Sequence, residues 1–168
     1  MADSPGIDLV DTWRTMIDIL ESGRVRAIGV SNFQAEHLRT IIKATGVTPA
    51  VNQIELHPYL CQEQLRALHD SLGIVTESWS PLGRGRLLEE PVVRDVAATL
   101  GVTPAQVVIR WHVQHGLVVI PKTTHCERMR VNADVFSFGL SREQMAAIDA
   151  CDRGLRTGSH PDRVQERS

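Results

Sequence analysis

The sequence predicts an α/β fold with a parallel sheet, and three observations lead to this prediction. A pattern of helix, glycine, short strand and polar exit occurs three times, with strand centres about 24 residues apart, which is the period of a parallel β/α unit. Each helix is followed by a glycine, which readily adopts the left-handed conformation that ends a helix. The strands are short and apolar, as expected where helices cover a parallel sheet.

The elements of the three repeated units follow in order along the chain. Apolar residues recur at helical spacing in three stretches, which are predicted as helices: residues 11–22, 35–45 and 62–72. A short apolar run follows each helix and is predicted as a strand: residues 27–30, 50–56 and 74–79.

The fourth unit is longer than the first three. Residues 80–86 have the composition of a loop, and two helices are predicted after them. Pro91 lies early in the first of these helices, and a capping box that begins at Thr103 opens the second. The fourth strand is predicted at residues 118–120. Two further helices follow it, and the second begins with a capping box at Ser141.

Four strands make about half of a barrel. A complete (β/α)₈ barrel of TIM type takes about 250 residues, so a chain of 168 residues predicts about four of the eight units, with extra helices before and after the last strand. An open doubly wound sheet is the alternative, but no G-x-G-x-x-G follows any strand. We therefore expect a single domain over residues 1–168, of which residues 154–168 are polar and form a flexible tail.

The composition excludes several classes of protein. A net charge of −2 and a pI near 6.4 indicate no basic surface for nucleic acid or for an anionic membrane. The sequence contains no apolar run of the roughly 20 residues that span a bilayer, and the N-terminus lacks the apolar core of a secretory signal. Three widely spaced cysteines fit neither a disulfide framework nor a metal site. We expect a cytoplasmic protein without nucleic-acid or membrane partners.

The stretch after the fourth strand has the chemistry of a phosphate site. Lys122 contributes a flexible cation, Thr123 and Thr124 contribute hydroxyl groups, and Arg128 contributes a planar guanidinium suited to phosphate. A helix begins soon after them, and its first turn has unpaired N–H groups and a positive partial charge. Taken alone, this stretch is also compatible with an ordinary strand end that carries solvated cations.

Polar residues also end the other strands, at the edge where ligands bind in parallel β/α folds. These residues are Ser31, Asn32, Gln53, Glu55, Trp79 and Ser80. Small amides and hydroxyls can hydrogen-bond a carboxamide, and an indole face can stack on a flat ring. Together with the phosphate site, they predict a nicotinamide dinucleotide bound across the mouth of the barrel.

The sequence resembles the carboxyl-terminal half of the aldo-keto reductases, in particular the bacterial 2,5-diketo-gluconate reductase-like enzymes. Four motifs carry this resemblance, and they occur in the right order and at the right spacing from about residue 11 to residue 164. They lie at residues 28–33 (IGVSNF), 51–58 (VNQIELHP), 79–83 (WSPLG) and 120–123 (IPKT), the last with Arg128 and Asn132 behind it.

The resemblance implies NADPH as the cofactor and assigns its parts to particular residues. Trp79 would stack on the nicotinamide ring, and Asn132 would reach the adenine. Three polar residues would bind the nicotinamide carboxamide: Ser31, Asn32 and Gln53. The residues near the pyrophosphate would be Ser80, Leu82, Gly83 and Arg84. The residues that clasp the 2′-phosphate would be Lys122, Thr123 and Arg128, with the hydroxyl of Thr124 beside them.

The resemblance also implies that the catalytic residues lie elsewhere. The family uses an Asp, a Tyr, a Lys and a His on the first four strands, and the His belongs to a His-Trp-Pro sequence that is not found here. Tyr59, the only tyrosine, does not match the catalytic position. No catalytic residue and no metal ligand is therefore assigned in this chain.

Two hypotheses follow for the function. In the first, the chain is the cofactor-binding half of a truncated or divided NADPH-dependent reductase of small carbonyl compounds. In the second, it is a non-catalytic half-barrel that binds NADPH or associates with itself. Because an open sheet has exposed edges, the expected partner is a complementary N-terminal half or a second copy that closes the barrel.

Overall fold

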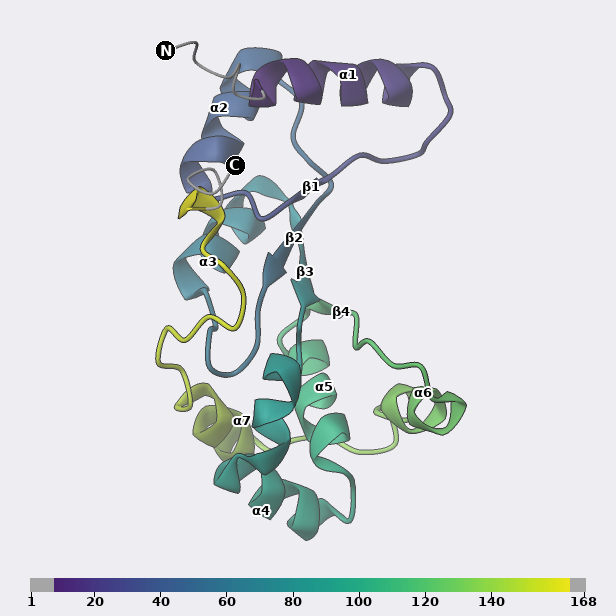
Figure 1. Ribbon diagram of the computed structural model, residues 1–168, viewed down its shortest axis with the longest axis vertical. Helices are drawn as coiled ribbons and strands as arrows, with labels where there is room; N and C mark the ends of the chain where they lie inside the picture. The colour runs from purple at the N-terminus through teal and green to yellow at the C-terminus, as the bar shows by residue number, and fades with distance from the viewer. Residues whose placement is uncertain (1–7, 164–168) are drawn as a thin grey trace.

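The computed structural model describes residues 8–163, which are organised around a parallel sheet of four strands in the order β1-β2-β3-β4 (Figure 1). The strands are β1 (Val30–Ser31), β2 (Val51–Glu55), β3 (Val75–Trp79) and β4 (Val118–Val119). Gln53 of β2 lies opposite Glu77 of β3, and Glu77 lies opposite Val118 of β4. The predicted α/β class and the parallel arrangement are confirmed. Closure of these strands into part of a barrel stays a prediction.

The helices also agree with the sequence-based expectations. The α-helices in the described residues are α1 (Leu9–Glu21), α2 (Ala35–Thr45), α3 (Glu63–Leu72), α4 (Pro91–Leu100), α5 (Pro104–Gln114), α6 (Cys126–Ala133) and α7 (Arg142–Asp149). The predicted capping boxes are present: Gln106 N donates to Thr103 Oγ1, and Gln144 N donates to Ser141 Oγ. These ends are reliable from sequence because a cap involves residues only three apart.

The first strand differs from the prediction. It was expected at residues 27–30, whereas β1 covers Val30–Ser31 only. The preceding segment still follows β2, because Ala50 N donates to Ile28 O at 2.9 Å. Gly29 lies so close to β2 that a Cβ atom there would be 2.7 Å from Val51 O. Here the two backbones lie close together instead of forming a regular ladder of hydrogen bonds between strands.

The loop after β3 is more ordered than its composition indicates. Residues 80–86 were expected to be an irregular loop, but a 3₁₀ helix, η1 (Gly83–Glu89), occupies most of this stretch. Arg84 and Gly85 interrupt it with positive φ angles of 54° and 90°. The kink removes any helical periodicity, so the sequence carries no signal for this element.

One face of the sheet is covered and the other is open. Ile54 of β2 is buried against helical residues that include Trp111 of α5 and Ile148 of α7, in the larger of two apolar clusters. Side chains that alternate with the covered ones remain accessible: Val75 and Val118 are 46% and 44% exposed. The second cluster joins α1 to α2 through buried residues that include Trp13.

The chain after α7 returns to the carboxyl ends of the strands. In Figure 1 this segment, coloured yellow, runs from α7 past α3 towards α2. Leu155 N donates to Tyr59 O at 2.9 Å, and Thr157 binds the side chain of Glu55. Residues 154–163 are thus attached to the body of the protein. Residues 164–168, the rest of the predicted flexible tail, lie outside the described residues.

Between residues 8 and 163, no single helix is long and apolar enough to cross a membrane. Helices α4 and α5 are long and apolar enough only when taken together, and they are bent by 95° relative to each other.

Candidate functional site

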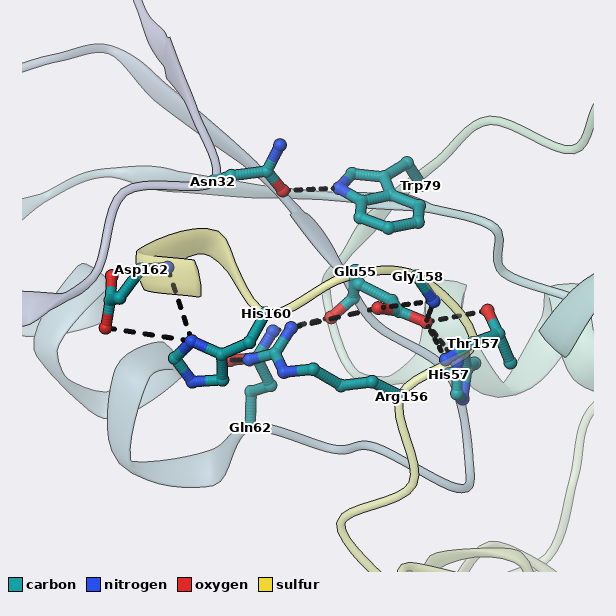
Figure 2. Close-up of polar contacts among 10 residues, drawn as sticks. All are labelled: Asn32, Glu55, His57, Gln62, Trp79, Arg156, Thr157, Gly158, His160 and Asp162. Carbon is teal, nitrogen blue, oxygen red and sulfur yellow. Dashed lines mark hydrogen bonds and ion pairs between the residues drawn. The ribbon is translucent and has the colours of Figure 1, made fainter. Parts of the chain in front are cut away.

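A contact between Asn32 and Trp79 defines the centre of the candidate site. The two residues follow or end β1 and β3, and Trp79 Nε1 donates a hydrogen bond to Asn32 Oδ1 at 2.7 Å (Figure 2). An indole N–H only donates, so the amide oxygen must face it, and the Asn32 NH₂ group is left for another partner. Asn32 adopts a left-handed conformation, with φ of 61°, that asparagine tolerates better than most residues.

A buried polar network holds the loop that carries Asn32. The amide side chain of Asn52 accepts from Phe33 N at 3.3 Å and donates to Phe33 O at 2.9 Å. The same Nδ2 lies 3.0 Å from His69 Nε2, and His69 Nδ1 lies 2.8 Å from Thr76 Oγ1. Since an amide nitrogen only donates, His69 is neutral, with its proton on Nδ1. Burial accordingly lowers the pKa of His69.

Glu55, at the end of β2, is fully buried and anchors the C-terminal segment. Its carboxylate accepts hydrogen bonds from Thr157 Oγ1 at 2.7 Å, from Thr157 N, and from Gly158 N at 3.1 Å. Arg156 lies 3.8 Å away, and His57 Nε2 lies 3.2 Å away. Burial by itself would raise the pKa of Glu55, but the hydrogen bonds from Thr157, Gly158 and His57 together lower it below its ordinary value.

The C-terminal segment forms one wall of a hollow beside the indole. Gly158 lies against the ring, and a Cβ atom there would be 2.6 Å from Trp79 Cη2. The hollow has a volume of about 440 Å³. Four of the sequence-predicted cofactor residues line it: Ser31, Asn32, Trp79 and Arg84.

A second hollow, of about 480 Å³, holds five more of the predicted residues: Leu82, Lys122, Thr123, Arg128 and Asn132. Lys122 and Arg128 are both exposed. Neither makes an ion pair with any residue in the described range, whereas the nearby Arg130 lies 4.0 Å from Glu127. Helix α6 begins at Cys126 beside this hollow, so its positive end adds to the two free cations. The arrangement is suited to an anion such as a phosphate.

The segment after β3, which includes η1, connects the two hollows, because Arg84 lines the first and Leu82 lines the second. Four predicted residues line neither hollow: Gln53, Ser80, Gly83 and Thr124. The side chain of Gln53 is hydrogen-bonded to Glu77. Gly83 is buried against Leu87, and Ser80 adopts a positive φ of 51° that helps to turn the chain after β3. Their assignment to the cofactor stays a prediction.

Two buried titratable residues outside the hollows, Tyr59 and His112, have partners within the body of the protein. The hydroxyl of Tyr59 donates to Glu90 at 2.6 Å, and burial together with this acidic partner raises the pKa of Tyr59 to about 12. His112 is buried, and its ring nitrogens lie 2.8 Å and 3.2 Å from backbone carbonyl oxygens. Among residues 8–163 there is no group of three His, Cys, Asp or Glu side chains that could hold a metal ion.

Sequence reasoning missed the contribution of the C-terminal segment. Glu55 was recognised as a polar residue at a strand end, but Thr157 and Gly158, which bind it, were assigned to a flexible tail. The available signal was Glu55 itself, because a carboxylate in a predicted strand needs donors from somewhere. Its partners lie 102 and 103 residues away, so the sequence offered no means of naming them.

Comparisons with known proteins identify related sequences and structures. Residues 3–153 match the model of the Aldo/keto reductase family. The chain is 55% identical to 2,5-diketo-D-gluconic acid reductase B of Corynebacterium sp. (strain SHS752001), over 94% of this chain and 57% of that protein. It is 47% identical to methylglyoxal reductase DkgA of Escherichia coli (strain K12), over 94% of this chain and 58% of that protein.

The solved structures agree with this result. The crystal structure of a Gox0644 mutant in complex with NADPH superposes with a TM-score of 0.90 and 50% sequence identity, and the match covers 92% of this chain and 58% of that chain. Apo Gox0644 superposes with a TM-score of 0.88 and 51% identity, over 90% of this chain and 56% of that one. The chain therefore spans a little over half the length of the relatives it matches.

Proposed function

The chain belongs to the Aldo/keto reductase family, and from this premise we propose that its two hollows together bind NADPH for the reduction of a small carbonyl compound to an alcohol. The observation that carries the proposal is the Asn32–Trp79 pair. It presents an unused amide NH₂ group and an indole at one hollow, while two free cations line the other.

The residues present fit the chemical parts of this cofactor. The Asn32 NH₂ group is suited to a carboxamide oxygen, and the half-buried Trp79 is suited to stack on a flat ring. Lys122 and Arg128 are suited to the 2′-phosphate that distinguishes NADPH from NADH. When bound, NADPH would supply a hydride. The protein side chains would hold the two ends of the cofactor apart and fix one face of its ring.

The relatives support both the cofactor and the substrate class. Gox0644, at 50% identity, has been crystallised with NADPH. The names of two other relatives specify a reductase of 2,5-diketo-D-gluconic acid and a reductase of methylglyoxal, so we propose a small carbonyl compound as the substrate here. We also propose a cytoplasmic location, which is supported by the free state of all three cysteines.

The open face of the sheet supports a proposal about partners. Val75, Val118 and Ile120 are 46%, 44% and 48% exposed on or beside β3 and β4, and exposed apolar side chains of this kind mark surfaces that become covered. We propose that further strands cover this face and complete a barrel of which this chain forms about half. A complementary N-terminal half would also supply the proton donor of the reaction. A second copy of the chain would instead give the non-catalytic binding module.

A titration with NADPH, followed by tryptophan fluorescence, tests the cofactor site. Lys122→Ala and Arg128→Ala should each weaken NADPH binding about tenfold, the value of one lost charged contact, and should change NADH binding little. Arg130→Ala is the matched control, because Arg130 pairs with Glu127 instead of lining the hollow. Equal effects on NADPH and NADH would contradict the phosphate assignment, and no saturation at millimolar NADPH would contradict the proposal for this chain.

Turnover separates the two forms of the proposal. Reduction of methylglyoxal with NADPH, once a complementary half is supplied, would favour the reductase. Light scattering that shows a dimer which binds NADPH but has no activity with that half would favour the binding module.

A further inference from the structure

Trp79 is held at two separate places on its ring. Asn32 accepts the indole N–H on one side, and Gly158 of the C-terminal segment lies against Cη2 and Cζ3 on the other. The position of Gly158 leaves no room for a side chain, since a Cβ atom would be 2.6 Å from Cη2. The orientation of the indole therefore depends on where the C-terminal segment lies.

Glu55 determines where that segment lies. The carboxylate is 0% exposed, and it receives hydrogen bonds from Thr157 N, Thr157 Oγ1 and Gly158 N (Figure 2). A buried carboxylate is costly unless donors surround it, so Glu55 binds these donors strongly. Arg156 is 3.8 Å from Glu55 Oε2 and also donates to Gln62 Oε1 at 3.3 Å, which holds the residue directly before Thr157.

We propose that Glu55 is a positioning residue of the cofactor site: by binding residues 157 and 158, it seats Gly158 against Trp79 and so fixes the ring that faces the first hollow. The consequence for cofactor binding rests on the proposed function. The effect on the ring itself does not, because it follows from contacts within the chain alone.

The test uses the chain labelled with 5-fluorotryptophan and its ¹⁹F NMR spectrum without cofactor. Trp13, Trp79 and Trp111 give three resonances, and Trp79→Phe identifies the one of interest. Trp13 and Trp111 are buried at 2% and 0% exposure in the two apolar clusters, so they report on whether the fold is intact. Glu55→Gln preserves the size of the side chain but turns one acceptor into a donor that opposes the N–H groups of residues 157 and 158.

We expect Glu55→Gln and Gly158→Ala to shift the Trp79 resonance and to leave the other two in place. Glu36→Gln and Gly139→Ala are the matched controls. Glu36 is exposed on α2, and a Cβ atom at Gly139 would meet nothing closer than 3.8 Å. Neither control should move any resonance. An unchanged Trp79 resonance in Glu55→Gln, with the fold intact, would overturn the proposal, even if Gly158→Ala shifts it by direct contact with the ring.

A second readout connects the ring to the cofactor. Glu55→Gln should weaken NADPH binding roughly tenfold, as expected when charged hydrogen bonds that order the site are lost. Gly158→Ala should weaken it as well, because its Cβ atom displaces the ring. If Glu55→Gln itself fails to fold, Thr157→Val removes only the hydroxyl donor and should produce a smaller shift of the same resonance. A Trp79 shift without NADPH binding in the parent chain would support the positioning role and refute the proposed function. Unaltered NADPH affinity despite a Trp79 shift would refute the role of Glu55 in cofactor binding.

Discussion

Asn32 Oδ1 lies 2.7 Å from Trp79 Nε1, and this contact joins the carboxyl ends of β1 and β3 across the intervening strand β2. It connects residues 47 positions apart and assigns a separate task to each end of the Asn32 amide. The oxygen holds the indole, and the NH₂ group remains for a ligand.

Replacing Asn32 in two ways separates these tasks. Asn32→Asp keeps an oxygen for the indole N–H but removes the NH₂ group, and aspartate also tolerates the left-handed backbone. We expect unchanged Trp79 fluorescence in the free protein and about tenfold weaker NADPH binding. Asn32→Ala removes both groups, so it should alter the free-state fluorescence as well. A normal NADPH affinity in Asn32→Asp would contradict the assignment of the NH₂ group.

The buried histidines predict that stability falls in mild acid. Burial lowers the pKa of His112 to about 4, although carbonyl oxygens of Val108 and Leu56 favour its charged form. Burial also lowers the pKa of His57 and His69. The unfolded chain binds protons below about pH 6.5 while the folded chain does not, so the stabilisation is complete above pH 6.5 and is lost as pH falls towards 4.

For His112 alone, the loss over this range is on the order of 3 kcal/mol. Urea denaturation at pH 7.5, 5.5 and 4.5 measures the change in unfolding free energy. His112→Gln should flatten this dependence, and an equally steep dependence in that variant would exclude His112 as a source. Glu55 affects stability at lower pH. Because its pKa is lowered in the folded protein, Glu55 stabilises the fold above about pH 4.5, and this stabilisation is lost as the pH falls below that value.

Anchoring of the C-terminal segment predicts resistance to trypsin after Arg156. The side chain of Arg156 is only 17% exposed and lies between Glu55 and Gln62, so cleavage requires this contact to open first. Glu55→Gln should increase the cleavage rate about tenfold, in line with the loss of roughly 1.4 kcal/mol of local stability. Mass spectrometry of timed digests gives the rate. Cleavage after Arg26, in the exposed segment before β1, should stay the same.

The close approach of Gly29 to β2 predicts a loss of stability on substitution. A Cβ atom at residue 29 would be 2.7 Å from Val51 O, which is backbone and cannot move aside easily. Gly29→Ala should lower the unfolding free energy by about 1–3 kcal/mol, as overpacking does. Urea denaturation beside Gly139→Ala, where a Cβ atom has room, provides the comparison. Equal urea midpoints for the two variants would show that β2 and the segment at Gly29 can move apart without loss of unfolding free energy.

Local signals explain which parts of the fold were predictable. The capping box from Thr103 to Gln106 and the left-handed Gly46 and Gly73 identify helix ends through contacts within a few residues. The 3₁₀ helix η1 was missed because its positive φ angles at Arg84 and Gly85 depend on how the loop fits the body of the protein. The same limit applies to β1, whose length depends on pairing with β2.

The candidate site shows the same division. The parallel α/β class, the order of the elements and the kinds of side chain at the strand ends were readable from the sequence, because they follow from periodicity, caps and spacing within a few tens of residues. The pairing of Asn32 with Trp79, and the donors that Glu55 receives from Thr157 and Gly158, became visible only in the folded chain. A buried carboxylate requires hydrogen-bond partners, but which distant segment supplies them depends on how the whole chain packs.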